Sequence, residues 1–145
     1  MIKSKYKVKI GITIGDPSGI GPAVTLKSVE RLKGVAELVI IGDAWVLSKI
    51  RGHKVTSASI IDLANVARKN FVFGKVSAEY GRASLDYLGR ALQMLKEKKI
   101  DCLVTSPVSK EAVNLSGVRF SGHTEYLAQR SGAKHFAMML LNRKL

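Results

Sequence analysis

The alternation of short apolar runs with stretches of helical periodicity constrains the fold more than any other feature of the sequence. The apolar runs predict strands at residues 8–14, 37–41, 100–105 and 136–141. After the first run, Pro22 stands where proline best opens a helix, and apolar residues then recur every three or four positions. Strands alternating with helices form βαβ units, whose parallel sheet is covered on both faces. We therefore predict an α/β fold with a mostly parallel sheet and helices on both faces.

Local signals bound the first half of this pattern. Four apolar residues are expected to form the buried face of the first helix: Val24, Leu26, Val29 and Leu32. Gly34 suits the position just past the end of that helix, and Asp43 is a predicted N-cap of a short helix reaching Lys49. Residues 59–63 and 70–73 are predicted short strands or edges. The second half of the chain carries clearer signals.

A long amphipathic helix is predicted after Ser77, which is its expected N-cap. Leucines spaced by three and four residues form its apolar face: Leu85, Leu88, Leu92 and Leu95. Ser109 is expected to start a further short helix that Gly117 ends, and residues 121–124 lead into a last helix that stops near Gly132. No internal domain boundary is evident in residues 1–145.

Charge is the unusual part of the composition. The chain has 24 Lys and Arg residues against 11 Asp and Glu residues, a net charge of +13. Such an excess suits nucleic acid, a membrane surface or a phosphorylated small molecule. Aromatic residues make up 6% of the chain and the basic residues are scattered, which disfavours nucleic acid. No apolar stretch is long enough for a membrane span or a signal peptide, so we expect a cytoplasmic protein with no membrane partner.

The loop at residues 15–21 is the first candidate site. Gly19 and Gly21 would let the backbone approach an anion, but Val24 replaces the third glycine of a dinucleotide-binding fingerprint. Pro22 follows where a P-loop needs lysine. An anion-binding loop and a tight strand-to-helix turn therefore remain as alternatives.

The stretch at residues 105–110 is the second candidate. Its hydroxyls and Lys110 could hold a phosphate or carboxylate at the end of a strand. The simpler interpretation is favoured: Pro107 ends the strand, Ser109 caps a helix and Lys110 faces water. The lone cysteine, Cys102, lies in the apolar run before this stretch and is expected to be a buried, inert thiol.

His123 and Thr124 form the third candidate, at the mouth of a predicted helix. The other two histidines, His53 and His135, share no metal-ligand spacing with His123, which disfavours a three-histidine metal site. A hydrolase pair of Ser106 with His123 is also disfavoured, because no G-x-S-x-G elbow is present.

Four sequence blocks in order resemble the 4-hydroxythreonine-4-phosphate dehydrogenase (PdxA) family. They are ITIGDPSGIGP at residues 12–22, GKVSAEYGRASLDYL at 74–88, LVTSPVSKEAVN at 103–114 and SGHTEYLA at 121–128. One departure is Ala23, where the family usually has glutamate. The resemblance implies an α/β fold like that of isocitrate and isopropylmalate dehydrogenases, and a homodimer with active sites at the subunit interface.

The resemblance also implies a reaction. The family oxidises 4-phosphohydroxy-L-threonine with NAD or NADP, with decarboxylation, in pyridoxal phosphate (vitamin B6) biosynthesis. A divalent metal (Zn, Mg or Co) held by three histidines acts as the Lewis acid. His123 and Thr124 match the family's substrate-contacting pair. The metal histidines, the later substrate contacts and most of the nicotinamide site match positions beyond residue 145. We therefore expect an N-terminal part that is inactive alone, and assign no catalytic, metal or cofactor-binding residue to it.

Two alternatives to this function stay open. A related dehydrogenase could act on another phosphorylated hydroxy acid, such as threonate 4-phosphate. A small basic anion- or nucleic-acid-binding module is the alternative from another class, and it would need measurable nucleic-acid affinity at physiological salt.

Overall fold

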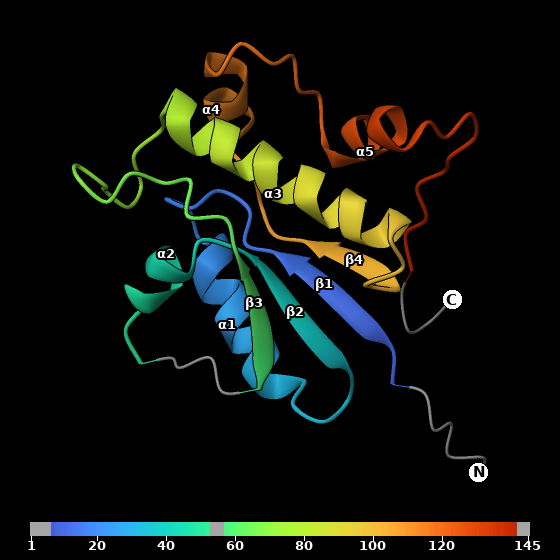
Figure 1. The fold of residues 1–145 in the computed structure, drawn as a ribbon. Helices are drawn as coiled ribbons and strands as arrows, with labels where there is room; N and C mark the ends of the chain where they lie inside the picture. The colour runs from blue at the N-terminus through green and yellow to red at the C-terminus, as the bar shows by residue number, and fades with distance from the viewer. Residues whose placement is uncertain (1–6, 53–56, 142–145) are drawn as a thin grey trace.

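A computed structural model describes residues 7–52 and 57–141, and Figure 1 shows its fold. The strands are β1 (Lys9–Thr13), β2 (Glu37–Gly42), β3 (Ala58–Asp62) and β4 (Cys102–Thr105). The helices are α1 (Gly21–Arg31), α2 (Ala44–Ser48), α3 (Ala78–Lys96), α4 (Lys110–Leu115) and α5 (His123–Ser131). The order of elements confirms the predicted βαβ alternation.

The four strands form one parallel sheet in the order β3-β2-β1-β4. β1 lies at the centre, where Ile12 pairs with Ile40 of β2 on one side and Val104 of β4 on the other. Helices α1 and α2 cover one face of the sheet and α3 covers the other, with α4 and α5 packed beyond α3 (Figure 1). The predicted fold class is confirmed. Within the described ranges, no helix combines the length and apolarity that crossing a membrane requires.

Helix α1 begins at Gly21 with Pro22 in its first turn, as predicted. Its buried face differs from the prediction, however. Leu26 and Val29 are buried, but the expected partners Val24 and Leu32 are 41% and 38% exposed. The inner side of the helix instead carries buried Gly21, Pro22 and Thr25. The apolar residues of α1 are therefore divided between a face that packs on the sheet and a stripe that stays partly exposed.

Helix α3 is buried on two faces rather than one. The predicted stripe is confirmed for Leu85, Leu88 and Leu92, and its first two members pack with α4 and α5 in a small second core. A second stripe packs on the sheet and consists of Tyr80, Ala83, Tyr87, Ala91 and Met94. Ser77 caps the helix by accepting a hydrogen bond from the Tyr80 backbone N–H, as predicted. Helix α3 therefore packs against two cores, the main core at the sheet and the small second core with α4 and α5.

Three predictions about apolar segments are wrong. Residues 136–141 are not a strand: they are exposed, and no strand of the described chain pairs with them. Residues 70–73 form a turn and loop whose Phe71 ring packs on Trp45 and Tyr80. Cys102 is exposed rather than buried, because β4 is an edge strand and helix α1 does not cover it. The strand predicted at 59–63 is present as β3.

Candidate functional site

The candidate site lies where β1 and β4 end side by side, since Thr13 and Thr105 are paired in register. Carboxyl ends of parallel strands are where α/β proteins gather ligands. Two loops leave the sheet here, at residues 14–20 and 106–109, and both were candidates from the sequence. Their contacts show what each can do.

Close backbone packing explains the glycines of the first loop. Asp16 donates its backbone N–H to the Pro107 carbonyl oxygen over 2.9 Å. Gly15 has φ +70°, and a Cβ there would lie 2.2 Å from that same oxygen. A Cβ on Gly21 would lie 2.1 Å from the Ile14 carbonyl oxygen. The glycines therefore let the two loops interlock, which favours the tight-turn interpretation over an anion cradle.

An Asx turn stabilises the tip of this loop. The buried Asp16 carboxylate accepts the Ser18 backbone N–H over 2.8 Å. The Ser18 hydroxyl lies 2.7 Å from the Lys75 carbonyl oxygen, and Gly74 donates its N–H to the Ser18 carbonyl. Hydrogen bonds within the loop and to the backbone of residues 74 and 75 therefore hold its tip in place.

The second loop agrees with the simpler interpretation of its sequence. Ser109 accepts a hydrogen bond from the Ala112 N–H and caps α4, and Lys110 is exposed. Ser106 is buried, and its hydroxyl lies 2.9 Å from that of Thr25 on α1. The Ser106 hydroxyl is therefore part of an internal pair, not of a hydrolase site with His123.

His123 is the first residue of α5. Its Nε2 atom is buried and has no hydrogen-bond partner among the described residues, and its ring meets the Phe120 ring edge-on at 5.8 Å. Burial lowers the pKa of His123, and the nearby positive charge of Lys110 lowers it further. The imidazole is therefore neutral at pH 7 and has an unused polar atom. Thr124 follows in the same first helical turn and is half-buried.

The other histidines do not join His123. His135 is exposed, and His53 lies outside the described residues. Over the described ranges, no three His, Cys, Asp or Glu side chains gather closely enough to hold a metal ion. The residues present here do not fit a metal by themselves.

A buried polar cluster at the ends of β2 and β3 was missed by the sequence reading. Asp43 precedes α2, but its side chain does not cap that helix. It accepts the Tyr87 hydroxyl at 2.6 Å and the Val66 backbone N–H, while Asp62 accepts the Ala44 N–H of α2. Burial and the Asp43 hydrogen bond raise the pKa of Tyr87, so its proton stays on the ring oxygen.

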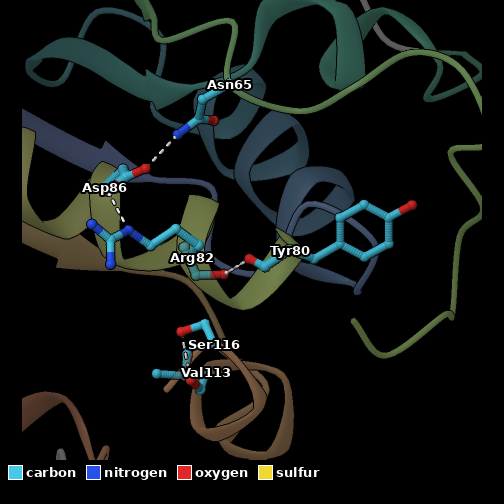
Figure 2. A network of polar contacts seen from close by, with 7 residues as sticks. Asn65, Tyr80, Arg82, Asp86, Val113 and Ser116 are labelled. Atoms are coloured by element: carbon cyan, nitrogen blue, oxygen red, sulfur yellow. Dashed lines mark hydrogen bonds and ion pairs between the residues drawn. The ribbon is translucent and has the colours of Figure 1, made fainter. Parts of the chain in front are cut away.

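The same cluster continues onto α3, where Figure 2 shows Asp86 between Asn65 and Arg82. Asn65 donates its Nδ2–H to Asp86 over 3.0 Å, and Arg82 Nε lies 3.6 Å from the same carboxylate. The Asn65–Asp86 hydrogen bond ties the loop after β3 to α3, whereas Arg82 and Asp86 both belong to α3. No local sequence signal marks the Asn65–Asp86 and Tyr87–Asp43 contacts, because their partners lie more than 20 positions apart.

The structure defines an α/β chain with a parallel sheet, whose candidate ligand-contacting residues His123 and Thr124 open its last described helix. The family model described as "Pyridoxal phosphate biosynthetic protein PdxA" matches residues 14–145. The chain belongs to this family, which confirms the resemblance carried by the four sequence blocks.

Relatives and solved structures agree with this assignment. The chain is 39% identical to a 4-hydroxythreonine-4-phosphate dehydrogenase of Sulfurihydrogenibium and 35% identical to a D-threonate 4-phosphate dehydrogenase of Cupriavidus necator. These alignments cover 95% and 98% of this chain and 47% and 48% of the relatives. A 4-hydroxythreonine-4-phosphate dehydrogenase structure from Burkholderia phymatum matches 97% of the chain with TM-score 0.80 and 31% identity, over 48% of its own length. The chain spans about half the length of the relatives it matches.

Proposed function

We propose that this chain is the N-terminal part of an NAD- or NADP-dependent dehydrogenase that oxidises 4-phosphohydroxy-L-threonine in pyridoxal phosphate biosynthesis. The observation that carries the proposal is the family match over residues 14–145, together with the 39% identical dehydrogenase of Sulfurihydrogenibium. The proposal includes the cytoplasm as its location, which we expect from the sequence, and a homodimer as its assembly, which the resemblance implies.

The part of the site within this chain is a contact to the phosphorylated substrate. His123 has a buried, unpartnered ring nitrogen beside the positive charge of Lys110, and Thr124 adds a hydroxyl in the same helical turn. A neutral imidazole can donate one hydrogen bond to a phosphate or carboxylate oxygen. The first-turn N–H groups of α5 and the Lys110 ammonium favour an anion in the same place. We therefore propose that His123 and Thr124 bind and orient the substrate.

The cofactors of the reaction come from the resemblance alone. NAD or NADP would accept the hydride, and the protein would supply orientation. The described residues of this chain do not fit the divalent metal implied for the family (Zn, Mg or Co). Its ligands therefore belong to the part of the relatives' sequence that this chain does not cover. It follows that the 145-residue chain alone should neither turn over substrate nor hold a stoichiometric metal.

D-threonate 4-phosphate is the second candidate substrate, because the Cupriavidus necator relative named for it covers 98% of this chain. Both substrates carry a phosphate and a hydroxy acid, so the same His123 contact serves either.

The test is a full-length chimera with the C-terminal half of the Sulfurihydrogenibium relative appended to this chain. We expect NADH or NADPH formation with 4-phosphohydroxy-L-threonine. Preferential turnover of D-threonate 4-phosphate would select the alternative. A folded chimera that oxidises neither compound with either nucleotide would contradict the proposed function.

A further inference from the structure

A groove with a basic rim lies between helices α3 and α5, which pack together (Figure 1). It has a volume of about 520 Å³, and we call it the α3–α5 groove. The basic residues that line it come from both helices: Arg82, Arg90 and Lys96 of α3, and Arg130 of α5. Among the described residues that line it, one is acidic, Asp86. His123 and Thr124 do not line the groove, so it is separate from the proposed substrate contact.

The floor of the groove contains a glycine that packing within the described chain does not require. Gly89 lies in the middle of α3 and is exposed, and a Cβ added there would meet no atom within 4 Å. Glycine destabilises a helix interior relative to alanine, and one use that offsets this cost is a close approach of a ligand to the backbone. Leu85 and Leu92 lie about one turn before and after Gly89 and also line the groove. The missing side chain therefore leaves space at the centre of the groove.

Most of the positive charge around the groove has no carboxylate close to it. Arg82 lies 3.6 Å from the single acidic residue of the lining. Arg90, Lys96 and Arg130 form no ion pair within 4 Å with a carboxylate of the described residues. Arg90 instead donates a hydrogen bond to the Gln93 amide oxygen over 2.8 Å, and Lys96 donates one to the Arg130 carbonyl oxygen over 3.3 Å. Three cations are therefore available to an anion in the groove.

The accessible groups of the groove are charged rather than apolar. Leu85, Leu92 and Tyr126 are only 5%, 9% and 8% exposed, so they offer little surface to the apolar side chains of a docking helix. The Arg130 guanidinium lies over the Tyr126 ring, 5.4 Å from its centre. Since Tyr126 is the one aromatic residue of the described lining, the groove also lacks a free ring on which a nucleic-acid base could stack. A small anion therefore fits the groove better than a helix or a nucleic-acid strand.

The available cations lie at two positions along the groove. Arg90 and Lys96 are six residues apart in α3, which is a rise of about 9 Å along the helix axis. Lys96 and Arg130 share one position, because they are joined by the hydrogen bond described above. Arg and Lys side chains bind phosphate through charge-assisted hydrogen bonds. A molecule with two phosphate groups separated by about this length could therefore contact both positions.

We propose that the α3–α5 groove binds a small organic bisphosphate, with one phosphate at Arg90, the other at Lys96 and Arg130, and its organic part over Gly89. The volume of the groove, about 520 Å³, is typical of pockets for small molecules and leaves room for more than a single phosphate ion. The proposal goes beyond the proposed function, since both candidate substrates are monophosphates expected at His123. It holds whether or not the proposed reaction is correct.

The test is isothermal titration calorimetry of this chain with fructose 1,6-bisphosphate at physiological salt. Fructose 6-phosphate is the matched probe, because it has the same sugar and lacks one of the two phosphates. We expect the bisphosphate to bind at a 1:1 ratio. The monophosphate should bind at least about tenfold more weakly, because it can contact only one of the two cation positions at a time.

Three variants locate the bound molecule. Arg130→Gln removes one cation of the groove and should weaken bisphosphate binding at least about tenfold. Arg31→Gln is the matched control: it removes the same charge from an exposed arginine of α1, on the other face of the sheet, and should leave the affinity within about twofold. Gly89→Leu keeps every charge and fills the floor of the groove, so it should also weaken binding at least about tenfold. Circular dichroism of each variant checks its folding.

Three results would overturn the proposal. One is that the bisphosphate does not bind, or binds no more tightly than the monophosphate. Another is equal weakening by Arg130→Gln and Arg31→Gln, which would show attraction by the net charge of the chain alone. The third is unchanged binding to Gly89→Leu, which would place the ligand outside the groove. His123→Ala should leave bisphosphate binding unchanged, so a failure of this proposal and a failure of the proposed substrate contact are measured separately.

Discussion

Replacing His123 by alanine in the full-length chimera should reduce kcat/KM about 10- to 100-fold. Among the described residues Nε2 of this histidine has no hydrogen-bond partner, and the proposed substrate contact would supply one. A hydrogen bond to a charged group contributes about 1.5–3 kcal/mol. Since about 1.4 kcal/mol corresponds to a factor of ten in rate, its loss gives the expected range.

The same substitution should change stability little. The ring contact with Phe120 at 5.8 Å is lost, which costs on the order of 1 kcal/mol. Removing a buried nitrogen that has no partner offsets part of this cost. Because 1 kcal/mol shifts Tm by about 2–4 °C in domains of 150–250 residues, we expect a decrease below about 4 °C.

The assay is steady-state kinetics per folded molecule, with a thermal melt of the same sample. His135→Ala is the matched control, because that histidine is exposed, and it should leave both quantities at the parent values. If His123→Ala lowered Tm by more than about 8 °C while kcat/KM per folded molecule stayed unchanged, the histidine would be structural. That pattern would refute the substrate contact.

Three further predictions concern the chain as it stands. Gly21→Ala would put a Cβ 2.1 Å from a backbone carbonyl oxygen and should lower the free energy of unfolding by at least about 2 kcal/mol. Gly89 is the control: it is exposed in α3 with no atom within 4 Å of an added Cβ, so Gly89→Ala should raise that free energy by about 0.5–1 kcal/mol. Urea titration measures both changes. Tyr87→Phe should cost about 1–3 kcal/mol in the same assay, because it removes the 2.6 Å hydrogen bond to the buried Asp43 carboxylate; an unchanged stability would argue against that bond. Burial lowers the pKa of His123, so the unfolded chain binds more protons below pH about 6.5 and stability should fall as the pH falls through that value. His123→Ala should weaken this dependence in melts at pH 7.5 and 5.5, and an identical dependence would contradict it.

Local signals in the sequence predicted the elements well. The caps at Ser77 and Ser109 and the helix-ending glycines at 117 and 132 depend on neighbours within a few residues, and the structure has all four. The parallel sheet also followed, because strands that alternate with helices form βαβ units; the order of the strands was not predicted.

Burial was harder to predict than secondary structure, because it depends on distant partners. The apolar pattern at residues 136–141 is typical of a strand, but a strand also needs a neighbour to pair with. Cys102 was expected inside because its run is apolar, and it is exposed because β4 lies at the edge. Asp43 was expected to cap α2, and its carboxylate instead accepts the hydroxyl of Tyr87, 44 positions away.

The start of the helix that carries the candidate site was predicted, but the surroundings of the site were not. The placement of His123 and Thr124 at the mouth of a helix followed from the sequence, and α5 begins at His123. The unpartnered ring nitrogen and the nearby charge of Lys110 arise from packing between α4, α5 and the loop that carries Phe120. The role of the pair in binding substrate stays a prediction.

The central position of β1 has a consequence for the order in which the chain is made. β1 obtains its second neighbour from β4, which leaves the ribosome only after β2, β3 and the whole of α3. At about 5–20 residues per second, the roughly 40 residues between β3 and β4 take about 2–8 s to synthesise. During that time β1 is itself an open edge, and the loop before Gly21 lacks the Pro107 carbonyl that later holds Asp16. The nascent chain therefore passes through a stage in which β1 is paired with β2 but its other side has no strand to pair with.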